Sequence, residues 1–440
     1  MINIIKLSLR KLGLRNIKRK NKIMMLALIL IMSFIFTSCY DAKELDEYTY
    51  VIAVGIDKGV TDKYRLTIKF HTMKGGGGGE TGGTIGADFE ILVIDAPTFF
   101  TGINMINSAL ARELNFMHAK MLVFSKEIAE EGVSTFIAPI IRFRQIRHSI
   151  HVVVSKESAY EFLEKYEPIE GNAISKALEL IVSETSETGY IIHTRLHEFY
   201  TGLKSTFRQP MAILAGVNDM KNFVETGEEL QNQYSTEKEY TAGEIPRKGG
   251  GNVEFYGTAV FNGDKMIGEL TGEETRMLSI ILGEFKRGNF SIQDLYYPDK
   301  YVPIDIRMER QPKVEAKMKG DKVIFDVKIN LEGDILAIQS HLNYEEEPLK
   351  SSLEEAVVKK FKEEMNSLIE KCREWGVDIF RFGRVVCSNF RTIQEWENFN
   401  WLEKFKDSEV NINIIFNIRR TGILLKSSPI IDVEELKTQE

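Results

Sequence analysis

The amino terminus restricts how this chain can fold more than any other segment, because it cannot belong to the folded body. Residues 1–38 contain eight Lys or Arg residues and no Asp or Glu, and they include an apolar run at 23–36 that only Ser33 interrupts. A transmembrane helix needs about 20 apolar residues, so this run is too short for a full span. A basic segment before a short apolar run is typical of a secretory signal peptide. We therefore expect residues 1–38 to be a signal peptide and the fold to begin after them.

Cys39 directly follows this segment, in the sequence Phe36-Thr37-Ser38-Cys39. Small residues before the cysteine leave the backbone accessible to a signal peptidase, and the thiol can form a thioether to a diacylglyceryl group. We expect Cys39 to be lipidated, which would anchor the mature chain to membrane lipid. The alternatives are an uncleaved anchor and ordinary secretion with an incidental Cys39.

The charge of the mature chain restricts its partners. The full chain has 57 basic and 64 acidic residues, and removal of the eight basic residues in 1–38 leaves 49 against 64, a net charge of −15. Nucleic-acid binding needs a concentrated basic face, so we expect no nucleic-acid partner. The acidic balance also argues against a body that lies flat on anionic lipid, which leaves attachment to the lipid on Cys39.

Length and element order indicate an α+β protein with more than one domain. The roughly 400 mature residues exceed what a single hydrophobic core commonly holds. Strand and helix patterns follow one another without strict strand–helix–strand alternation, so we expect mixed sheets with flanking helices rather than a doubly wound sheet. Residues 218–250 are polar and lack an apolar period, which predicts an exposed insertion. The expected division is a signal peptide at 1–38, α+β domains at 39–205, 206–295 (with the insertion) and 296–426, and a tail at 427–440.

Local patterns predict individual elements. Asn262-Gly263-Asp264 between two apolar runs predicts a β-hairpin, because both central turn positions can take positive φ. Thr271 with Glu274 three residues later predicts a helical capping box, with Met277, Leu278 and Ile281 facing inward. Apolar residues at intervals of three and four through 352–375 predict a long amphipathic helix. Strands are expected at 48–56, 64–70, 88–94, 120–124, 150–154, 253–261, 265–270, 302–308, 313–318, 322–331 and 410–418, and further helices at 97–112, 126–132, 158–165, 172–183, 194–203 and 393–405, with one more after 378.

Motifs with catalytic or metal-binding potential are incomplete. Gly77, Gly79 and Gly82 match dinucleotide-binding spacing, but an expected strand follows them instead of the helix that holds a pyrophosphate, so a hairpin tip is favoured. His193 and His197 have zinc-protease spacing but lack the glutamate directly after the first histidine. The sequence contains no Gly-x-Ser-x-Gly elbow, the commonest signal of a serine hydrolase. We expect a protein that is not an enzyme, with no catalytic, cofactor-binding or metal-binding residues.

Three further features each allow two interpretations. Arg142, Arg144 and Arg147 form either a solvated helix face, which is favoured, or a site for an anion or an acidic partner. The block 375–383 is either a packed turn between helices, which is favoured, or a protein-contact patch. Cys372 and Cys387 are either two buried thiols, which is favoured, or a disulfide.

Seven segments taken together resemble the Ger(x)C family of spore germination lipoproteins, the C subunits of nutrient germinant receptors. Residues 39–46 resemble the family's Cys-Trp-Asp-x-x-Glu-Ile/Leu-Asn/Asp, with Tyr40 in place of Trp. Residues 116–123 resemble a Gly-His-Leu-Lys stretch, with Met117 in place of Gly. The other similar segments are Val54-Gly55-Ile56-Asp57-Lys58 with the glycine tract, Tyr256-Gly257-Thr258-Ala259-Val260-Phe261, Leu270-Thr271-Gly272-Glu273-Glu274-Thr275-Arg276, Glu374-Trp375-Gly376-Val377-Asp378 and Ile418-Arg419-Arg420-Thr421-Gly422, all in family order.

The resemblance implies a three-domain α+β lipoprotein on the outer face of the inner spore membrane. It implies a complex with a polytopic A subunit and a transporter-like B subunit, which responds to nutrients and starts ion and dipicolinate release. It implies no established catalytic activity for the C subunit, in agreement with the incomplete motifs. A solute-binding lipoprotein of a transporter is the alternative function.

Overall fold

The structure is a computed structural model that describes residues 21–28, 47–72, 88–167, 185–223, 240–320 and 322–421. The chain divides into two compact units, residues 1–48 and 49–440. Residues 21–28, inside the expected signal peptide, are helical. Cys39, the glycine tract at 75–86 and the expected helix at 172–183 lie outside the described residues. No helix in the described part of the chain combines the length and the apolar composition needed to cross a membrane.

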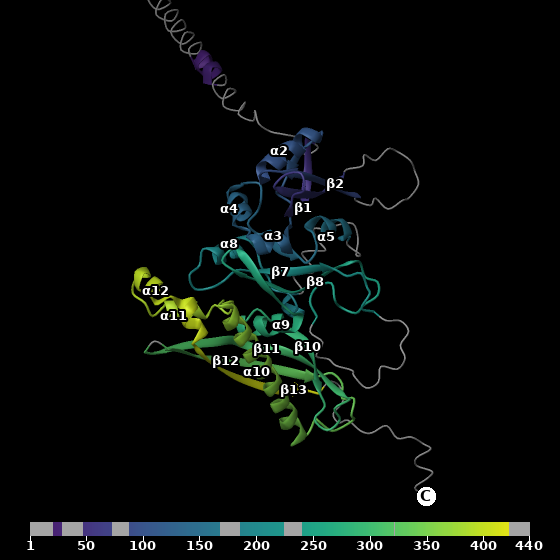
Figure 1. The fold of residues 1–440 in the computed structure, drawn as a ribbon, viewed down its shortest axis with the longest axis vertical. Helices are drawn as coiled ribbons and strands as arrows, with labels where there is room; N and C mark the ends of the chain where they lie inside the picture. The colour runs from purple at the N-terminus through teal and green to yellow at the C-terminus, as the bar shows by residue number, and fades with distance from the viewer. Residues whose placement is uncertain are drawn as a thin grey trace, which may run out of the picture. The chain divides into compact units, whose positions relative to one another are not determined.

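Two sheets organise the second unit (Figure 1). The large sheet has the strand order β3-β2-β1-β5-β6-β7-β8-β9, with β4 paired to β1, and the small sheet has the order β10-β11-β12-β13. β1, β5, β6 and β7 run parallel to one another, whereas β2, β3, β8 and β9 join through antiparallel pairs. The α+β class with mixed sheets and flanking helices is therefore confirmed. The strands of the large sheet are β1 (Tyr48–Lys58), β2 (Tyr64–Thr72), β3 (Asp88–Ala96), β4 (Glu113–Asn115), β5 (Met121–Ser125), β6 (His151–Ser155), β7 (Met211–Val217), β8 (Val253–Asn262) and β9 (Lys265–Leu270).

Helices cover both faces of the large sheet, because its central parallel strands are apolar on both sides. All five residues of β5 and of β6 are buried, as expected for parallel strands inside an α/β layer. Successive side chains of a strand point to opposite faces, so Leu122 and Phe124 join one core and Met121 and Val123 the other. The first core holds α2 (Phe99–Ala109), α3 (Lys126–Glu131), α4 (Ser134–Arg142) and α8 (Leu196–Leu203), and the second holds α5 (Ala159–Lys165); α7 (Thr185–Thr188) precedes α8.

The small sheet buries one face. In β12 (Lys322–Ile335) the residues at alternate positions, such as Val323, Phe325 and Val327, are buried, which is the pattern of a sheet with one covered side. β11 (Tyr301–Lys319) is one long strand where the sequence predicted two. The buried face belongs to a core that includes the long helix α10 (Leu349–Trp375). The other elements are β10 (Arg287–Gln293), β13 (Glu409–Arg420), α11 (Phe382–Cys387), α12 (Ile393–Phe399) and α13 (Trp401–Lys406).

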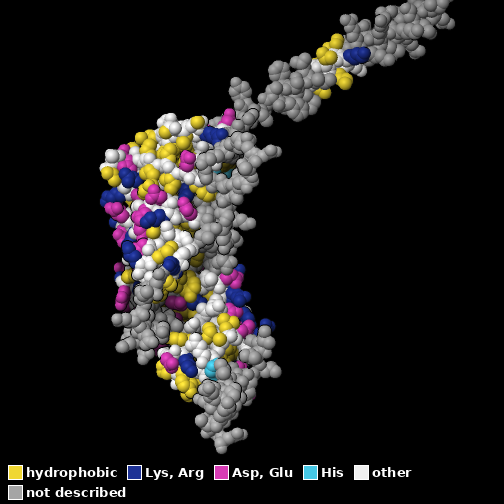
Figure 2. All heavy atoms as spheres, turned by 90° about the vertical axis from the view of Figure 1, so that its right-hand side faces the viewer, with side chains coloured by type: hydrophobic (Ala, Val, Ile, Leu, Met, Phe, Trp, Pro, Cys, Tyr) yellow, Lys and Arg dark blue, Asp and Glu magenta, His cyan; other side chains and the backbone are white. Residues whose placement is uncertain are grey.

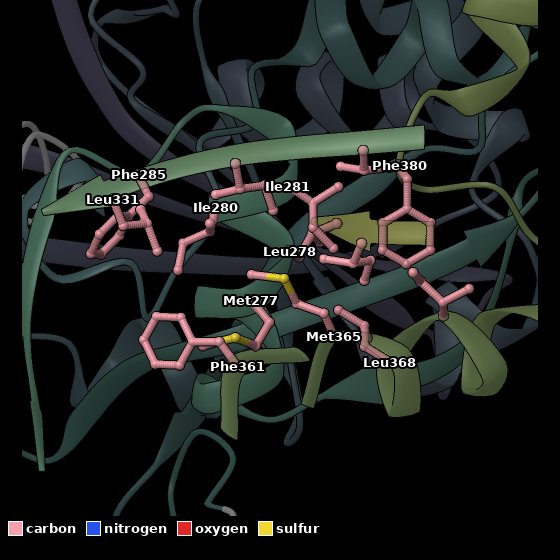
Figure 3. Packing of buried hydrophobic residues seen from close by; sticks show 14 of the residues in the cluster. Met277, Leu278, Ile280, Ile281, Phe285, Leu331, Phe361, Met365, Leu368 and Phe380 are labelled. Carbon is pink, nitrogen blue, oxygen red and sulfur yellow. The ribbon is translucent and has the colours of Figure 1, made fainter. Parts of the chain in front are cut away.

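Helix α9 (Gly272–Leu282) connects the two sheets. It contacts β8 and β9 of the large sheet, β11 and β12 of the small sheet, and α10. Figure 3 shows its apolar side chains packed against Phe361, Met365 and Leu368 of α10. The predicted inward residues Met277, Leu278 and Ile281 are all buried.

Neither expected domain boundary coincides with a change of sheet. The boundary at 205/206 lies between β6 and β7, which pair in parallel in the large sheet. The boundary at 295/296 lies between β10 and β11, which pair in the small sheet. In the expected insertion 218–250, Asn218 and Ala242 are buried, and their backbones donate to the carbonyls of Asn252 and Tyr256. The described part of that segment is therefore not uniformly exposed.

Candidate functional site

The amino terminus of α9 is built as the sequence predicted. Thr271 Oγ1 accepts a hydrogen bond from the Glu274 backbone at 3.2 Å, and Glu274 Oε2 accepts one from the Thr271 backbone at 2.9 Å. This reciprocal capping box satisfies two backbone donors that a helix start leaves open. Lys371 of α10 places its ammonium 2.7 Å from Glu274 Oε1. The cap therefore also ties α9 to α10.

Arg276 lies at the centre of the contacts around α9. It is 2% exposed, and its guanidinium donates to the Asn289 carbonyl at 2.7 Å and to the Tyr190 hydroxyl at 3.2 Å. The guanidinium carbon is 3.4 Å from the centroid of the Phe290 ring, and a Glu273 oxygen is 3.3 Å from Nη1. A buried charge is tolerated when it is paired and hydrogen-bonded. Arg276 thus holds the residue-190 segment, α9 and β10 together.

Two stacked tyrosines complete this region. The rings of Tyr190 and Tyr256 are stacked with centroids 4.7 Å apart, and burial raises the pKa of both hydroxyls. The Gly257 backbone donates to the Tyr190 carbonyl at 2.8 Å with a φ of 96°, and the hydroxyls of Thr258 and Thr275 are 3.0 Å apart. A side chain at Gly272 would collide with the Tyr256 ring. The two sequence segments 256–261 and 270–276 therefore meet through direct contacts.

A cleft of about 520 Å³ opens beside Arg276, between α9, β10 and α10. Its acidic lining residues outnumber its basic ones, Lys360 and Arg276, and Lys360 is 3.0 Å from Glu364. The described residues that line it include no histidine or cysteine, so they provide no nucleophile activated by an imidazole. The acidic lining residues are Glu273, Glu274, Glu363 and Glu364.

A second cleft, of about 290 Å³, lies at the carboxyl ends of β1, β5 and β6. Ligands of open α/β sheets commonly bind at such an edge. Here the Asp57 carboxylate accepts hydrogen bonds from the Ala159 and Tyr160 backbones at 2.6 and 2.9 Å, so it caps α5. Burial nevertheless raises the pKa of Asp57. Arg65 pairs with Asp95 at 2.8 Å and Lys156 with Glu244 at 2.7 Å. These charged side chains of the cleft therefore already bind other groups of the protein.

Asp378 organises the segment that follows α10. Its carboxylate is fully buried and accepts hydrogen bonds from the backbones of Phe380, Phe382 and Gly383 and from the Trp401 indole at 2.9 Å. Burial raises the pKa of this carboxyl to about 6, while the four donors favour its charged form. Residues 377–380 are buried. The predicted packed turn at 375–383 is confirmed.

The motif residues weighed from the sequence do not converge. Helix α8 begins at Leu196, so His193 precedes the helix that contains His197 and the two do not share a helical face. His193 instead lies beside His151, with ring centroids 5.5 Å apart, and desolvation lowers the pKa of His151 to about 4. Within the described residues, no cluster of three His, Cys, Asp or Glu side chains could hold a metal ion. Cys372 and Cys387 are free thiols, the first buried and the second half-buried.

Arg276 and its tyrosine partners were missed by reasoning from the sequence. The capping box identified α9, but Arg276 resembles any solvated helical arginine in sequence. One signal in the sequence could have indicated that Arg276 is buried. Arg276 and Ser279 are polar residues in a predicted helix that has no clear polar face toward solvent.

Two family models match the chain: the spore germination protein N-terminal domain at residues 41–217, and the spore germination B3/GerAC-like C-terminal domain at residues 256–422. The second range begins in β8, so the large sheet continues across the gap between the two matched ranges.

The chain is similar to three spore germination proteins of Bacillus subtilis (strain 168) over nearly its whole length. It is 22% identical to the provisionally named YfkR over 413 residues, which are 93% of this chain and 99% of that protein. It is 20% identical to spore germination protein KC over 422 residues (93% and 98%) and 21% identical to YndF over 434 residues (92% and 98%). The crystal structure of the GerBC protein matches with a TM-score of 0.47 and 15% identity, and covers 83% of this chain and 96% of that one. The chain belongs to the Ger(x)C family of spore germination proteins.

Replacement of Arg276 by methionine, which keeps an unbranched apolar stem but removes the guanidinium, should lower the free energy of unfolding by about 2–4 kcal/mol. The change removes charged hydrogen bonds to Asn289 and Tyr190, and such bonds contribute roughly 1.5–3 kcal/mol each. Chemical denaturation would measure it. The matched control is Arg310→Met, because the Arg310 side chain is 76% exposed and should change stability by less than about 0.5 kcal/mol. Equal effects of the two substitutions would contradict the role given to Arg276.

Asp378 should make stability depend on pH in an unusual direction. Burial raises the pKa of Asp378 from its ordinary value of 3.8 to about 6 in the folded protein, so the folded state binds more protons than the unfolded state between these pH values. The contribution of the carboxyl to stability is therefore complete below pH 4 and declines as pH rises toward 6, on the order of 2–3 kcal/mol in all. The difference in unfolding free energy between wild type and Asp378→Asn, measured from pH 4 to 7, should show this decline. Exposed Asp407→Asn is the control, and a difference that rises with pH would refute the assignment.

Proposed function

We propose that the chain is a lipid-anchored, non-enzymatic subunit of a spore nutrient germinant receptor, needed for receptor assembly or for the signal that triggers germination. The observation that carries this proposal is the match of both family models, in order, across 41–217 and 256–422. The relatives align over 98–99% of their own length. A chain with the family's full architecture is expected to share its place in a receptor.

The proposed anchor is a diacylglyceryl group on Cys39, which would hold the body on the outer face of the inner spore membrane. The basic and apolar segments before Cys39 support it. Stable anchoring of a protein needs more than one acyl chain, and lipoproteins with a diacylglyceryl group meet that need. The proposed partners are therefore the membrane lipid, a polytopic A subunit and a transporter-like B subunit.

The internal use of charged groups supports a non-enzymatic role. The carboxylates of Asp57 and Asp378 are held by backbone N–H groups, and Arg276 is held between Asn289 and Tyr190. Catalytic acids and bases need a reactive partner within reach of a substrate. Here Asp57 caps α5, Asp378 holds the turn that leads into α11, and Arg276 ties α9 to β10.

A solute-binding lipoprotein of a transporter is the second candidate, and the cleft of about 520 Å³ beside Arg276 favours it. Such proteins hold a ligand between two similar lobes. The two sheets of this chain differ in strand number and in strand order, which favours the receptor subunit. Calorimetric titration of the protein with small molecules would separate the two, because micromolar binding by this chain alone is required of a solute-binding protein.

The test of the proposed function compares three spore strains: wild type, a deletion of this chain, and Cys39→Ala. The deletion should abolish germination in response to one class of nutrient while sporulation stays normal. Cys39→Ala should release the protein from the membrane fraction and weaken the same response, because the lipid provides the attachment. Germination is followed as loss of optical density after each nutrient, and the protein by immunoblot of membrane and soluble fractions. Unchanged responses to every nutrient, in a strain without a related receptor, would refute the function; full membrane retention of Cys39→Ala would refute the anchor.

A further inference from the structure

The edge of the large sheet at which the parallel strands β1 and β5 begin lies where the chain enters the second unit. Lys120 donates its backbone N–H to the Ile52 carbonyl at 2.7 Å, and the rings of Tyr50 and His118 are 5.2 Å apart. The loop before β5 therefore lies beside the start of β1. The segment after α4 reaches the same place, because Phe143 contacts Phe116 with ring centroids 5.6 Å apart.

Large apolar side chains are exposed at this edge. Phe100 is 39% exposed, Met105 42% and Met117 48%. The Phe100 ring packs edge-on against Phe143, with centroids 5.2 Å apart, which joins the exposed face of α2 to the loop after α4. Clustered apolar exposure of this kind marks an interaction surface more often than single exposed residues do.

The same edge is basic, although the body is acidic. Segments 99–120 and 141–150 contain five Lys or Arg residues and one acid, Glu113. Four of these residues are exposed arginines, and within the described part of the chain none of the four forms an ion pair. Lys and Arg side chains elsewhere in the body are commonly paired, as Arg65 is with Asp95 and Arg307 with Asp334. The edge patch consists of Phe100, Met105 and Met117 together with Arg112, Arg142, Arg144 and Arg147.

Residues 40–48, called the tether below, limit how far this edge can lie from Cys39. Nine residues, 40–48, separate Cys39 from Thr49, and an extended chain spans at most about 3.6 Å per residue, so Thr49 lies within roughly 35 Å of the lipidated cysteine. The tether has four acids and one lysine, so it does not itself attract anionic lipid. Any attraction to anionic lipid beside the anchor therefore has to come from the body.

Because salt screens charges over a short distance, the local charge of the edge patch affects contact with a membrane more than the net charge of the chain does. The Debye length in physiological salt is about 8 Å, so the acidic residues on the rest of the body contribute little to the potential at the edge patch. Each basic residue close to an anionic membrane strengthens binding about fivefold. Figure 2 shows Lys and Arg interspersed with Asp and Glu over the face of the body that it draws. The net charge of −15 therefore does not prevent this edge from contacting anionic lipid.

We infer that the edge patch docks on the anionic lipid surface to which Cys39 attaches the chain. The arginines contact lipid phosphates, and the side chains of α2 and the β4–β5 loop enter the interface between headgroups and acyl chains. This orients the body with the amino-terminal edge of its parallel strands toward the membrane. The inference rests on the proposed lipidation of Cys39.

The test uses the full lipidated chain in vesicles of phosphatidylcholine, with or without phosphatidylglycerol. An environment-sensitive fluorophore is attached at Met105→Cys or, as the control, at Ile415→Cys, an exposed residue of the small sheet. Both carry Cys387→Ser, because Cys387 is the half-exposed free thiol, whereas Cys372 is buried. Spin-labelled lipid in the bilayer should quench the probe at 105 several-fold more in vesicles with phosphatidylglycerol than without it, and should leave the probe at 415 unquenched in both.

Charge reversal separates the edge patch from the anchor. Arg142→Glu, Arg144→Glu and Arg147→Glu together should abolish the additional quenching at position 105 while the chain still sediments with the vesicles. The control makes the same change in net charge on α10 and β13, with Lys359→Glu, Lys362→Glu and Arg420→Glu, and should keep the quenching.

Three other outcomes would contradict either the docking on lipid or the lipidation of Cys39. No quenching at 105 with a chain that sediments overturns the inference and leaves the anchor intact. A chain that fails to sediment with either vesicle contradicts the lipidation of Cys39 instead. Absence of quenching in vesicles, with protection of position 105 from labelling in native spore membranes, would assign the edge patch to a protein partner and overturn its docking on lipid.

Discussion

The burial of α9 is the constraint on which the rest of the second unit depends. A helix that contacts two sheets and α10 has almost no face left for solvent, so even Thr275, Arg276 and Ser279 are buried with its apolar residues. Buried polar groups on α9 then need partners, and other segments supply them for three residues: Thr258 for Thr275, Asn289 and Tyr190 for Arg276, and Lys371 for Glu274. Because an unsatisfied buried polar group costs about 1–3 kcal/mol, these pairs fix how α9 sits between the sheets. The segments 256–261 and 270–276, which carry the family resemblance, are the ones that meet there.

Charged side chains have two different roles in this protein, one in its interior and one at the edge patch. Inside, carboxylates and guanidinium groups hold helices in place and are satisfied by backbone or side-chain partners, as at Asp378 and Arg276. Within the described residues, the exposed arginines of the edge patch form no ion pair. The proposed lipid on Cys39 would limit the distance of the body from the membrane, and the basic edge patch would limit its orientation. Both would serve the proposed role, in which the subunit presents a fixed face to membrane-embedded partners.

Much of the fold could be predicted from local patterns because those patterns have local causes. The hairpin at Asn262-Gly263-Asp264, the capping box of α9 and the amphipathic α10 depend on residues a few positions apart, and all three are present. β7 was missed, although its apolar run between Pro210 and Asn218 is typical of a buried parallel strand. The partners of Arg276 and Asp378 could not be predicted in this way, because Tyr190 and Trp401 lie far from them in sequence and meet them only after the sheets form. The same reason explains why the expected boundaries at 205/206 and 295/296 fall inside sheets.

The most direct test of the proposed role is to isolate the protein with its neighbours. An epitope-tagged chain, solubilised from spore membranes in mild detergent and purified by its tag, should bring with it two polytopic membrane proteins in amounts comparable to its own, as quantified by mass spectrometry. Recovery of those two proteins from wild-type spores, and their loss when the tag is on an unrelated lipoprotein, is the result that this account predicts. Purification of the chain alone, or with the permease and ATPase of a transporter, would contradict it.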